Sequence, residues 1–168
     1  KCIFDFEKAI DELPDAVRKS EDATAETIEN NVRRLIIDEM PTNPKYYQRM
    51  SELLDELVKQ RKRADIEYHK YLTRIIELSK QVKNPEQSAY YPLTINSKAK
   101  QAIYDNLERD EAKALAVHEA VMKSRQADWR GRIIPERAVK IAVKKELTGI
   151  SEDELKNLFE IIRNQNEY

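Results

Sequence analysis

The chain has 168 residues, of which 40% are apolar and 36% charged, with a net charge of −1 and only two glycines. This length is enough for one domain with a hydrophobic core and short for two. The near-zero net charge argues against a globally basic nucleic-acid- or membrane-binding protein, and the scarcity of glycine against tight hairpins and phosphate-binding loops. Because Glu, Lys, Ala and Leu are abundant, we predict an all-α fold, a bundle of about six to eight helices.

A single cysteine, Cys2, excludes an internal disulfide and favours a reducing cytoplasm. No apolar run approaches the roughly 20 residues that span a bilayer, and no signal-peptide pattern opens the chain, so we expect no membrane association. The sequence begins at Lys1 rather than at Met, which suggests a piece of a longer protein. We therefore expect an intracellular helical module.

In chain order, the first predicted helix covers Phe4–Leu13 and is stopped by Pro14. A second helix follows a polar stretch and ends at Pro41, because proline blocks helix continuation and restricts the residue before it. Steps of three and four place the apolar residues of this second helix on one face: Ile28, Val32, Leu35, Ile36 and Met40.

The 40-residue run from Asn43 to Val82 carries the longest apolar stripe and predicts either one long helix or a helical pair. Asn43 is a plausible N-cap, and Pro44 suits the first helical position. The stripe thins between Arg61 and Asp65, where we keep a break open, with Asp65 as a possible cap of a second helix. The tyrosines of this run are predicted to be mostly core residues: Tyr46, Tyr47, Tyr68 and Tyr71. Tyr47, Tyr68 and Tyr71 lie on the stripe, where the ring can pack while the hydroxyl reaches the surface.

Residues 84–96 contain two prolines and form the longest irregular segment. We predict a single all-helical domain over residues 1–168, in which this segment joins two layers, about 1–83 and 97–168. Four helices are predicted in the second layer, the last opening with a capping box in which Ser151 and Glu154 satisfy each other's free amides. They begin at Ser97, Asp110, Pro135 and Ser151.

Catalytic signatures are incomplete in this sequence. Neither glycine precedes the Lys-Ser/Thr pair of a phosphate-binding loop, so we expect no ATP site and no other bound cofactor. His118-Glu119-Ala120-Val121-Met122 departs from the HExxH zinc motif because a thioether replaces the second imidazole, and His118 reads as a partly buried helix residue. We therefore predict no metal site and no catalytic residue in this chain.

Two short triplets match half of a metal-dependent nuclease pattern, but both lie in predicted helices rather than on a sheet. They are Glu111-Ala112-Lys113 and Glu154-Leu155-Lys156. Cys2 has no nearby histidine or cationic pocket and reads as inert. A small helical enzyme is therefore the least favoured hypothesis.

The one local excess of positive charge lies between Trp129 and Leu147, a stretch that contains six basic residues and two glutamates. Three interpretations remain open: an ordinary solvated helix face with a buried indole, docking to an acidic partner, or direct DNA contact. If the face docks a partner, Trp129 should pack beneath the loop and Arg130 and Arg132 should point outward. The candidate contact residues are Trp129, Arg130, Arg132, Arg137, Lys140, Lys144 and Lys145.

Three separated blocks of sequence resemble a known family. The first is NPKYYQRMSELLDELVKQRK followed by IEYHKYLTRIIELSKQV, the second AIYDNL with the later EAVMKSRQADWRGR, and the third ERAVKIAVKKEL with the ending NQNEY. In order and spacing they resemble the C-terminal helical region of the R subunit (HsdR) of type I restriction-modification enzymes. The resemblance spans roughly residues 43–168.

The resemblance implies a parent subunit that is an ATP- and Mg²⁺-dependent enzyme, which translocates and cleaves DNA in a prokaryotic cytoplasm. It implies that this helical end joins the subunit to the methyltransferase core, made of modification and specificity subunits, with DNA bound in the full complex. The nuclease and motor motifs are missing from the matching blocks, so no catalytic residue is carried over. The alternative is a stand-alone helical nucleic-acid-binding domain that uses the basic residues 129–145.

Overall fold

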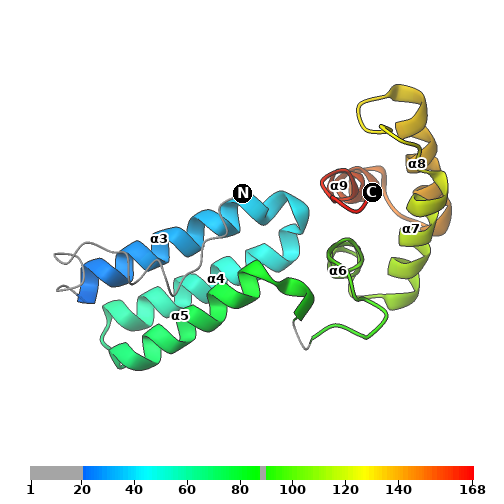
Figure 1. The fold of residues 1–168 in the computed structure, drawn as a ribbon. Helices are drawn as coiled ribbons and strands as arrows, with labels where there is room; N and C mark the ends of the chain where they lie inside the picture. Colours follow the sequence, from blue (N-terminus) through cyan, green and yellow to red (C-terminus); the bar gives the residue numbers. More distant parts are fainter. Residues whose placement is uncertain (1–20, 88–89) are drawn as a thin grey trace. The chain divides into compact units, whose positions relative to one another are not determined.

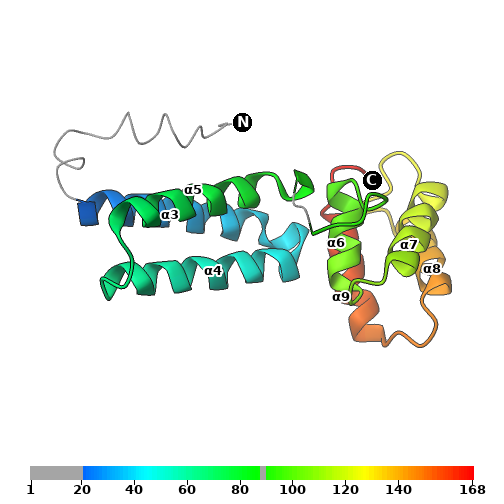
Figure 2. The same ribbon diagram turned by 90° about the horizontal axis from the view of Figure 1, so that it is seen from below.

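The computed structural model describes residues 21–87 and 90–168 (Figures 1 and 2). Within these residues the chain forms seven α-helices, two short 3-10 helices and no strand, which confirms the predicted all-α class. The predicted helix Phe4–Leu13 and Cys2 lie outside the described residues. No helix in the described part of the chain combines the length and the apolar character that crossing a bilayer requires.

The described residues form two compact units. The first contains the described residues up to Asp38 together with Tyr47–Pro85, and the second contains Glu39–Tyr46 and Glu86–Tyr168. The division near residue 85 falls within the predicted joining segment. The placement of Glu39–Tyr46 in the second unit was not expected, since the prediction divided the chain only once.

The first unit is built on three helices that run side by side, α3 (Glu21–Glu39), α4 (Pro44–Lys62) and α5 (Tyr68–Lys83) (Figures 1 and 2). Each contributes the apolar face expected from its spacing. Among the buried core residues are Ile28, Val32, Ile36, Tyr47, Met50, Leu54, Tyr71, Ile75 and Val82.

The long run from Asn43 to Val82 is a helical pair, because α4 ends at Lys62 and α5 begins at Tyr68. Asn43 accepts a hydrogen bond from the Tyr46 amide at 3.3 Å, as predicted for an N-cap. Asp65 does not cap α5, whose N-cap is Glu67. The Asp65 amide instead donates to the Gln60 carbonyl and closes α4, with Ala64 in the left-handed region.

The second unit contains η1 (Met40–Thr42), η2 (Pro85–Gln87, partly in the first unit), α6 (Lys98–Asn106), α7 (Glu111–Ser124), α8 (Ile133–Glu146) and α9 (Glu152–Arg163). α7 packs against both α6 and α8, and α6 also packs against α9. Figures 1 and 2 both show α7 and α8 side by side.

Local capping explains where these helices begin. Ser97 and Asp110 accept hydrogen bonds from the Lys100 and Lys113 amides, and Ser151 with Glu154 forms the predicted capping box. α8 begins at Ile133, two residues before the predicted start. Pro135 lies in its first turn, where a missing amide proton costs no helical hydrogen bond.

Four of the five residues after α9 are bonded to other parts of the second unit: Asn164, Gln165, Glu167 and Tyr168. Asn164 and Gln165 donate side-chain hydrogen bonds to the Pro41 and Thr42 carbonyls. The Ala99 amide donates to Glu167, and the Tyr168 carbonyl accepts from the indole of Trp129. The Asn164–Tyr168 segment, which belongs to the third resembling block, is therefore structural framework in the second unit.

Candidate interaction surface

Trp129 is a core residue of the second unit. Its exposed fraction is 1%, and its ring meets Phe159 edge to face at a centroid distance of 6.0 Å. The indole N–H donates to the Tyr168 carbonyl at 3.3 Å, so its only polar atom is paired. The indole is unavailable for stacking on a base, and it anchors the loop between α7 and α8. Both the docking interpretation and that of an ordinary solvated helix face expected a buried indole, so its burial does not separate them.

Arg130 is exposed, but its guanidinium is already engaged. It donates to the Arg163 carbonyl at 2.8 Å and to the Gln165 carbonyl, and it lies 5.0 Å from the centre of the Trp129 ring. Arg163 is the last residue of α9 and Gln165 follows its C-cap, so a cation is well placed at these carbonyls. Arg130 therefore stabilises the junction of α9 and the Asn164–Tyr168 segment, which differs from the outward role predicted for it.

The exposed side of α8 is opposite the face that packs into the core. Pro135, Val139 and Val143 are buried. Steps of three and four along the other side collect exposed residues that we name the α8 outer face. The α8 outer face consists of Ile133, Ile134, Arg137, Ile141, Lys144 and Lys145.

Its isoleucines are unusually exposed for large aliphatic residues. Ile133 is 85% exposed, Ile134 82% and Ile141 46%, all on one side of one helix. Single exposed apolar residues are normal on a protein surface, but a group of them marks an interaction site. The sequence analysis missed these residues, although Ile134 and Ile141 stand seven apart and out of phase with Val139 and Val143, which signals the opposite face.

The charge on the α8 outer face is positive and mostly unneutralised. Glu136 is the one carboxylate between Ile133 and Lys145, and it is turned to Arg163, 2.7 Å away, and to the Gly131 amide. Lys144 pairs with Glu152, whose pKa is lowered by that contact. Within the described residues, the side chains of four candidate residues make no hydrogen bond or ion pair: Arg132, Arg137, Lys140 and Lys145.

The predicted stripe of Arg137, Lys140 and Lys144 is therefore present on α8, but its members differ. Arg137 is exposed and unpaired in the described part of the chain, Lys140 is half-buried at the edge of the stripe, and Lys144 shares Glu152. The candidate residues therefore play different parts: Trp129 and Arg130 hold the fold, and Lys144 pairs with Glu152. The remaining four have side chains available to a partner: Arg132, Arg137, Lys140 and Lys145.

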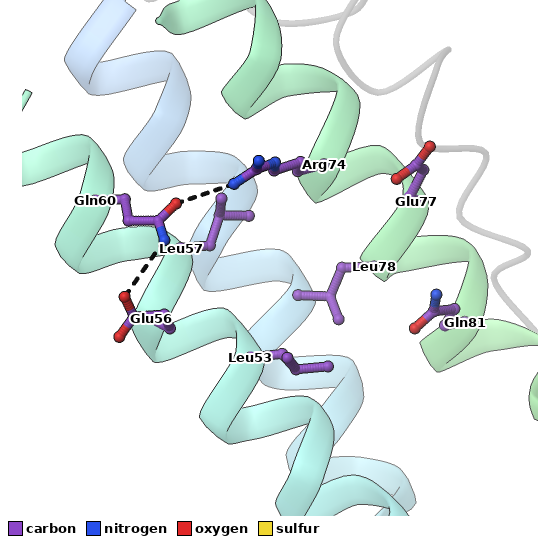
Figure 3. Close-up of a pocket in the computed structure, with 8 residues that line it drawn as sticks. All are labelled: Leu53, Glu56, Leu57, Gln60, Arg74, Glu77, Leu78 and Gln81. Atoms are coloured by element: carbon purple, nitrogen blue, oxygen red, sulfur yellow. Dashed lines mark hydrogen bonds between the residues drawn. The ribbon is translucent and has the colours of Figure 1, made fainter. Parts of the chain in front are cut away.

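The first unit offers a shallow groove between α4 and α5 (Figure 3). It measures about 250 Å³, and Leu53, Leu57 and Leu78 form its apolar floor. Its rim is polar and partly self-satisfied, because Arg74 donates to Gln60 at 3.1 Å and Gln60 donates to Glu56 at 3.3 Å. The rim carries both signs of charge, so it gives no preference for one kind of partner.

A larger pocket of about 460 Å³ lies in the second unit beside the loop that joins α8 and α9. Lys45 and Lys113 line it together with Glu108 and Glu154. Glu154 is committed to the capping box, and Lys113 lies 3.4 Å from Asp110. Its charged groups balance one another or serve helix capping, so the pocket shows no convergent set for a ligand.

Titratable groups buried elsewhere serve the fold. In the first unit, Glu29 accepts from Arg61 at 2.7 Å and from the Tyr71 hydroxyl at 3.0 Å, and burial raises the pKa of Tyr71. In the second unit, His118 is half-buried, as predicted, with its Nδ1 2.6 Å from the Tyr168 hydroxyl. Burial lowers the pKa of His118, and nearby Lys100 adds to that shift.

The nuclease-like triplets lie where the sequence placed them, at the starts of α7 and α9. Glu111 accepts a hydrogen bond from Thr94, and Glu154 belongs to the capping box. Among residues 21–87 and 90–168, no group of three or more His, Cys, Asp or Glu side chains is placed to hold a metal ion. The α8 outer face is the strongest candidate surface in the described chain.

Comparisons of the whole sequence with protein-family models, with curated proteins and with solved structures found no match.

Proposed function

We propose that this chain is the C-terminal helical assembly domain of the R subunit of a type I restriction enzyme. In this role it docks a subunit that translocates and cleaves DNA, using ATP and Mg²⁺ bound elsewhere in the parent, onto the methyltransferase core of modification and specificity subunits. The parent complex would act on DNA in a prokaryotic cytoplasm. The three resembling blocks support the family, and the structure supplies a surface suited to docking.

One observation carries the docking function: three isoleucines are exposed among cations on the α8 outer face. Leaving large aliphatic side chains in water forgoes about 25 cal/mol per Å² of burial, and a partner that covers them recovers that free energy. A surface used only for phosphate contacts gains nothing from isoleucine, since phosphates attract charge. The alternative, a stand-alone nucleic-acid-binding domain, rests on the basic side chains that make no contact within the chain: Arg132, Arg137, Lys140 and Lys145.

A competition experiment tests the proposal. The purified chain is titrated against an immobilised methyltransferase core, and the complete R subunit is then added. We expect saturable binding of the chain that the R subunit displaces, because both would occupy one site. No binding of the chain, or binding that the R subunit does not affect, would contradict the proposal.

A charge reversal and a DNA titration separate the proposed function from the alternative. Arg137, Lys140 and Lys144 changed together to Glu should leave the fold intact, since Lys140 has no ion pair and exposed charges and exposed ion pairs, such as Lys144 with Glu152, contribute little to stability. The variant should associate with the core more slowly, most clearly at low salt. Duplex DNA binding by the unaltered chain with a log–log salt slope near −5, as about six phosphate contacts would give, would instead favour the nucleic-acid-binding function.

A further inference from the structure

We propose that the α8 outer face binds an acidic amphipathic helix of the methyltransferase core, one that presents an apolar stripe flanked by Asp and Glu. This inference rests on the proposed function and adds the chemistry of the partner segment and the division of work between the residues of the surface.

The apolar part of the surface sets the shape of the partner. Ile134 and Ile141 are seven residues apart, which is two helical turns, and Ile133 adjoins Ile134 at the start of α8. A partner helix laid against α8 meets such a row with its own residues at steps of three, four and seven. Ile133 and Ile134 are more than four-fifths exposed, so they have the most surface to lose to a partner.

The charged part of the surface determines that the partner segment carries negative charge. Arg137 lies between the isoleucines, and Lys144 and Lys145 follow Ile141. Glu136 is turned away to Arg163, and Glu152 of α9 pairs with Lys144 alone, so the side chains of Arg137 and Lys145 keep an unpaired positive charge. A basic partner would meet unscreened like charge, whereas acidic residues beside an apolar stripe would pair with these cations.

The two parts of the surface predict separable effects. Long-range attraction between Arg137, Lys145 and an acidic helix acts on the association rate and weakens with salt. Burial of the isoleucines acts on the dissociation rate, because it is formed only after docking. If the face instead served a membrane or a nucleic acid, these changes would not alter the association and dissociation rates of one protein partner.

The experiment replaces Ile133, Ile134 and Ile141 together by Ser and measures binding to the immobilised methyltransferase core. Ile and Ser have similar helix propensities, so α8 itself should be unaffected. We expect Kd to rise at least about tenfold through faster dissociation, as expected from losing several buried aliphatic side chains. The matched control is Ile37→Ser, which removes an isoleucine that is 61% exposed on α3. It should bind like the unaltered chain.

A second variant tests the sign of the charge and guards against misfolding. Arg137→Glu with Lys145→Glu should slow association at low salt by about tenfold or more, with a smaller difference at high salt. Both variants should show the circular dichroism melt of the unaltered chain. If the triple serine variant melts early, single Ile134→Ser, with about a threefold or larger rise in Kd expected, replaces it.

Several outcomes overturn the inference. If the isoleucine variants bind as tightly as the unaltered chain, the isoleucines do not contact the partner; the proposed function would still stand. Faster association after charge reversal would make the partner surface basic. Isoleucine-dependent binding to vesicles with 30% phosphatidylserine, in place of the core, would assign the face to a lipid surface. Failure of the unaltered chain to bind the core would remove the proposed function itself, and the inference with it.

Discussion

Replacing Trp129 by Ala should destabilise the second unit strongly, because the indole is 1% exposed in the middle of its core. A buried tryptophan removes about 150–250 Å² from water, worth about 4–6 kcal/mol at about 25 cal/mol per Å². Alanine retains part of that burial, and truncation of a core tryptophan typically costs roughly 3–5 kcal/mol. The Tyr168 carbonyl also loses its indole donor, which adds about 1 kcal/mol. We therefore expect a loss near the upper end of the range.

Urea unfolding followed by circular dichroism at 222 nm measures this loss. Trp129 is the sole tryptophan of the chain, so its fluorescence cannot follow the alanine variant. A cost of 3–5 kcal/mol corresponds to a fall in melting temperature of about 6–20 °C for a chain of this size. Trp129→Phe keeps a ring against Phe159 and should cost much less than the alanine variant, about 1–2 kcal/mol.

Leu93→Ala is the matched control, because Leu93 is also apolar and belongs to the second unit but is 95% exposed. It should change the free energy of unfolding by less than about 0.5 kcal/mol. A loss below about 1 kcal/mol in Trp129→Ala would refute the reasoning, since it would mean that the indole is not part of the core that holds α9 and the Asn164–Tyr168 segment.

Three further predictions concern stability. Glu29→Leu should cost up to roughly 3–5 kcal/mol in urea unfolding, because it leaves the buried Arg61 with only the exposed carboxylate of Asp22, and adding Arg61→Met should restore most of the loss. The pKa of His118 is lowered in the folded chain, so the unfolded state binds more protons and the free energy of unfolding should fall as pH drops below about 6.5. In His118→Gln this fall should be smaller in unfolding curves taken from pH 7.5 to 5. Ser151→Ala should cost about 1 kcal/mol in urea unfolding, since it removes the cap of α9.

Each of these has a clear contrary result. Additive losses from Glu29→Leu and Arg61→Met would show that the two side chains do not depend on each other. An identical pH profile with and without His118 would assign the acid sensitivity to carboxylates. A free energy of unfolding unchanged by Ser151→Ala would mean that water replaces the cap without cost.

The limits of the helices could be predicted well because they depend on residues close in sequence. Ser97, Asp110 and Ser151 each accept from an amide three residues later, and Asn43 does the same for Tyr46. Such bonds need no tertiary partner. The prediction that Asp65 caps a helix was wrong for an equally local reason. The Asp65 amide donates to the Gln60 carbonyl and so ends the preceding helix, and residue types alone do not show whether Asp65 ends one helix or begins the next.

The candidate surface was only partly predictable. The sequence marked the right stretch, since Arg137, Lys144 and Lys145 are exposed on α8. It grouped them with Trp129 and Arg130, which the fold uses internally. Charge counts along a sequence do not reveal which cations find partners, because Arg130 binds carbonyls of residues 33 and 35 positions away.

The sequence by itself determined the all-α class, the apolar faces and the helix starts that have a side-chain cap, because helical periodicity and capping act over three to seven residues. The tertiary structure decided which faces stay open and which segments belong together. Asn164 and Gln165 hold the carbonyls of Pro41 and Thr42 across 123 positions of sequence, which draws Glu39–Tyr46 into the second unit. Such pairings depend on how whole helices pack, and α8 keeps its isoleucines exposed because its opposite side alone fills the core.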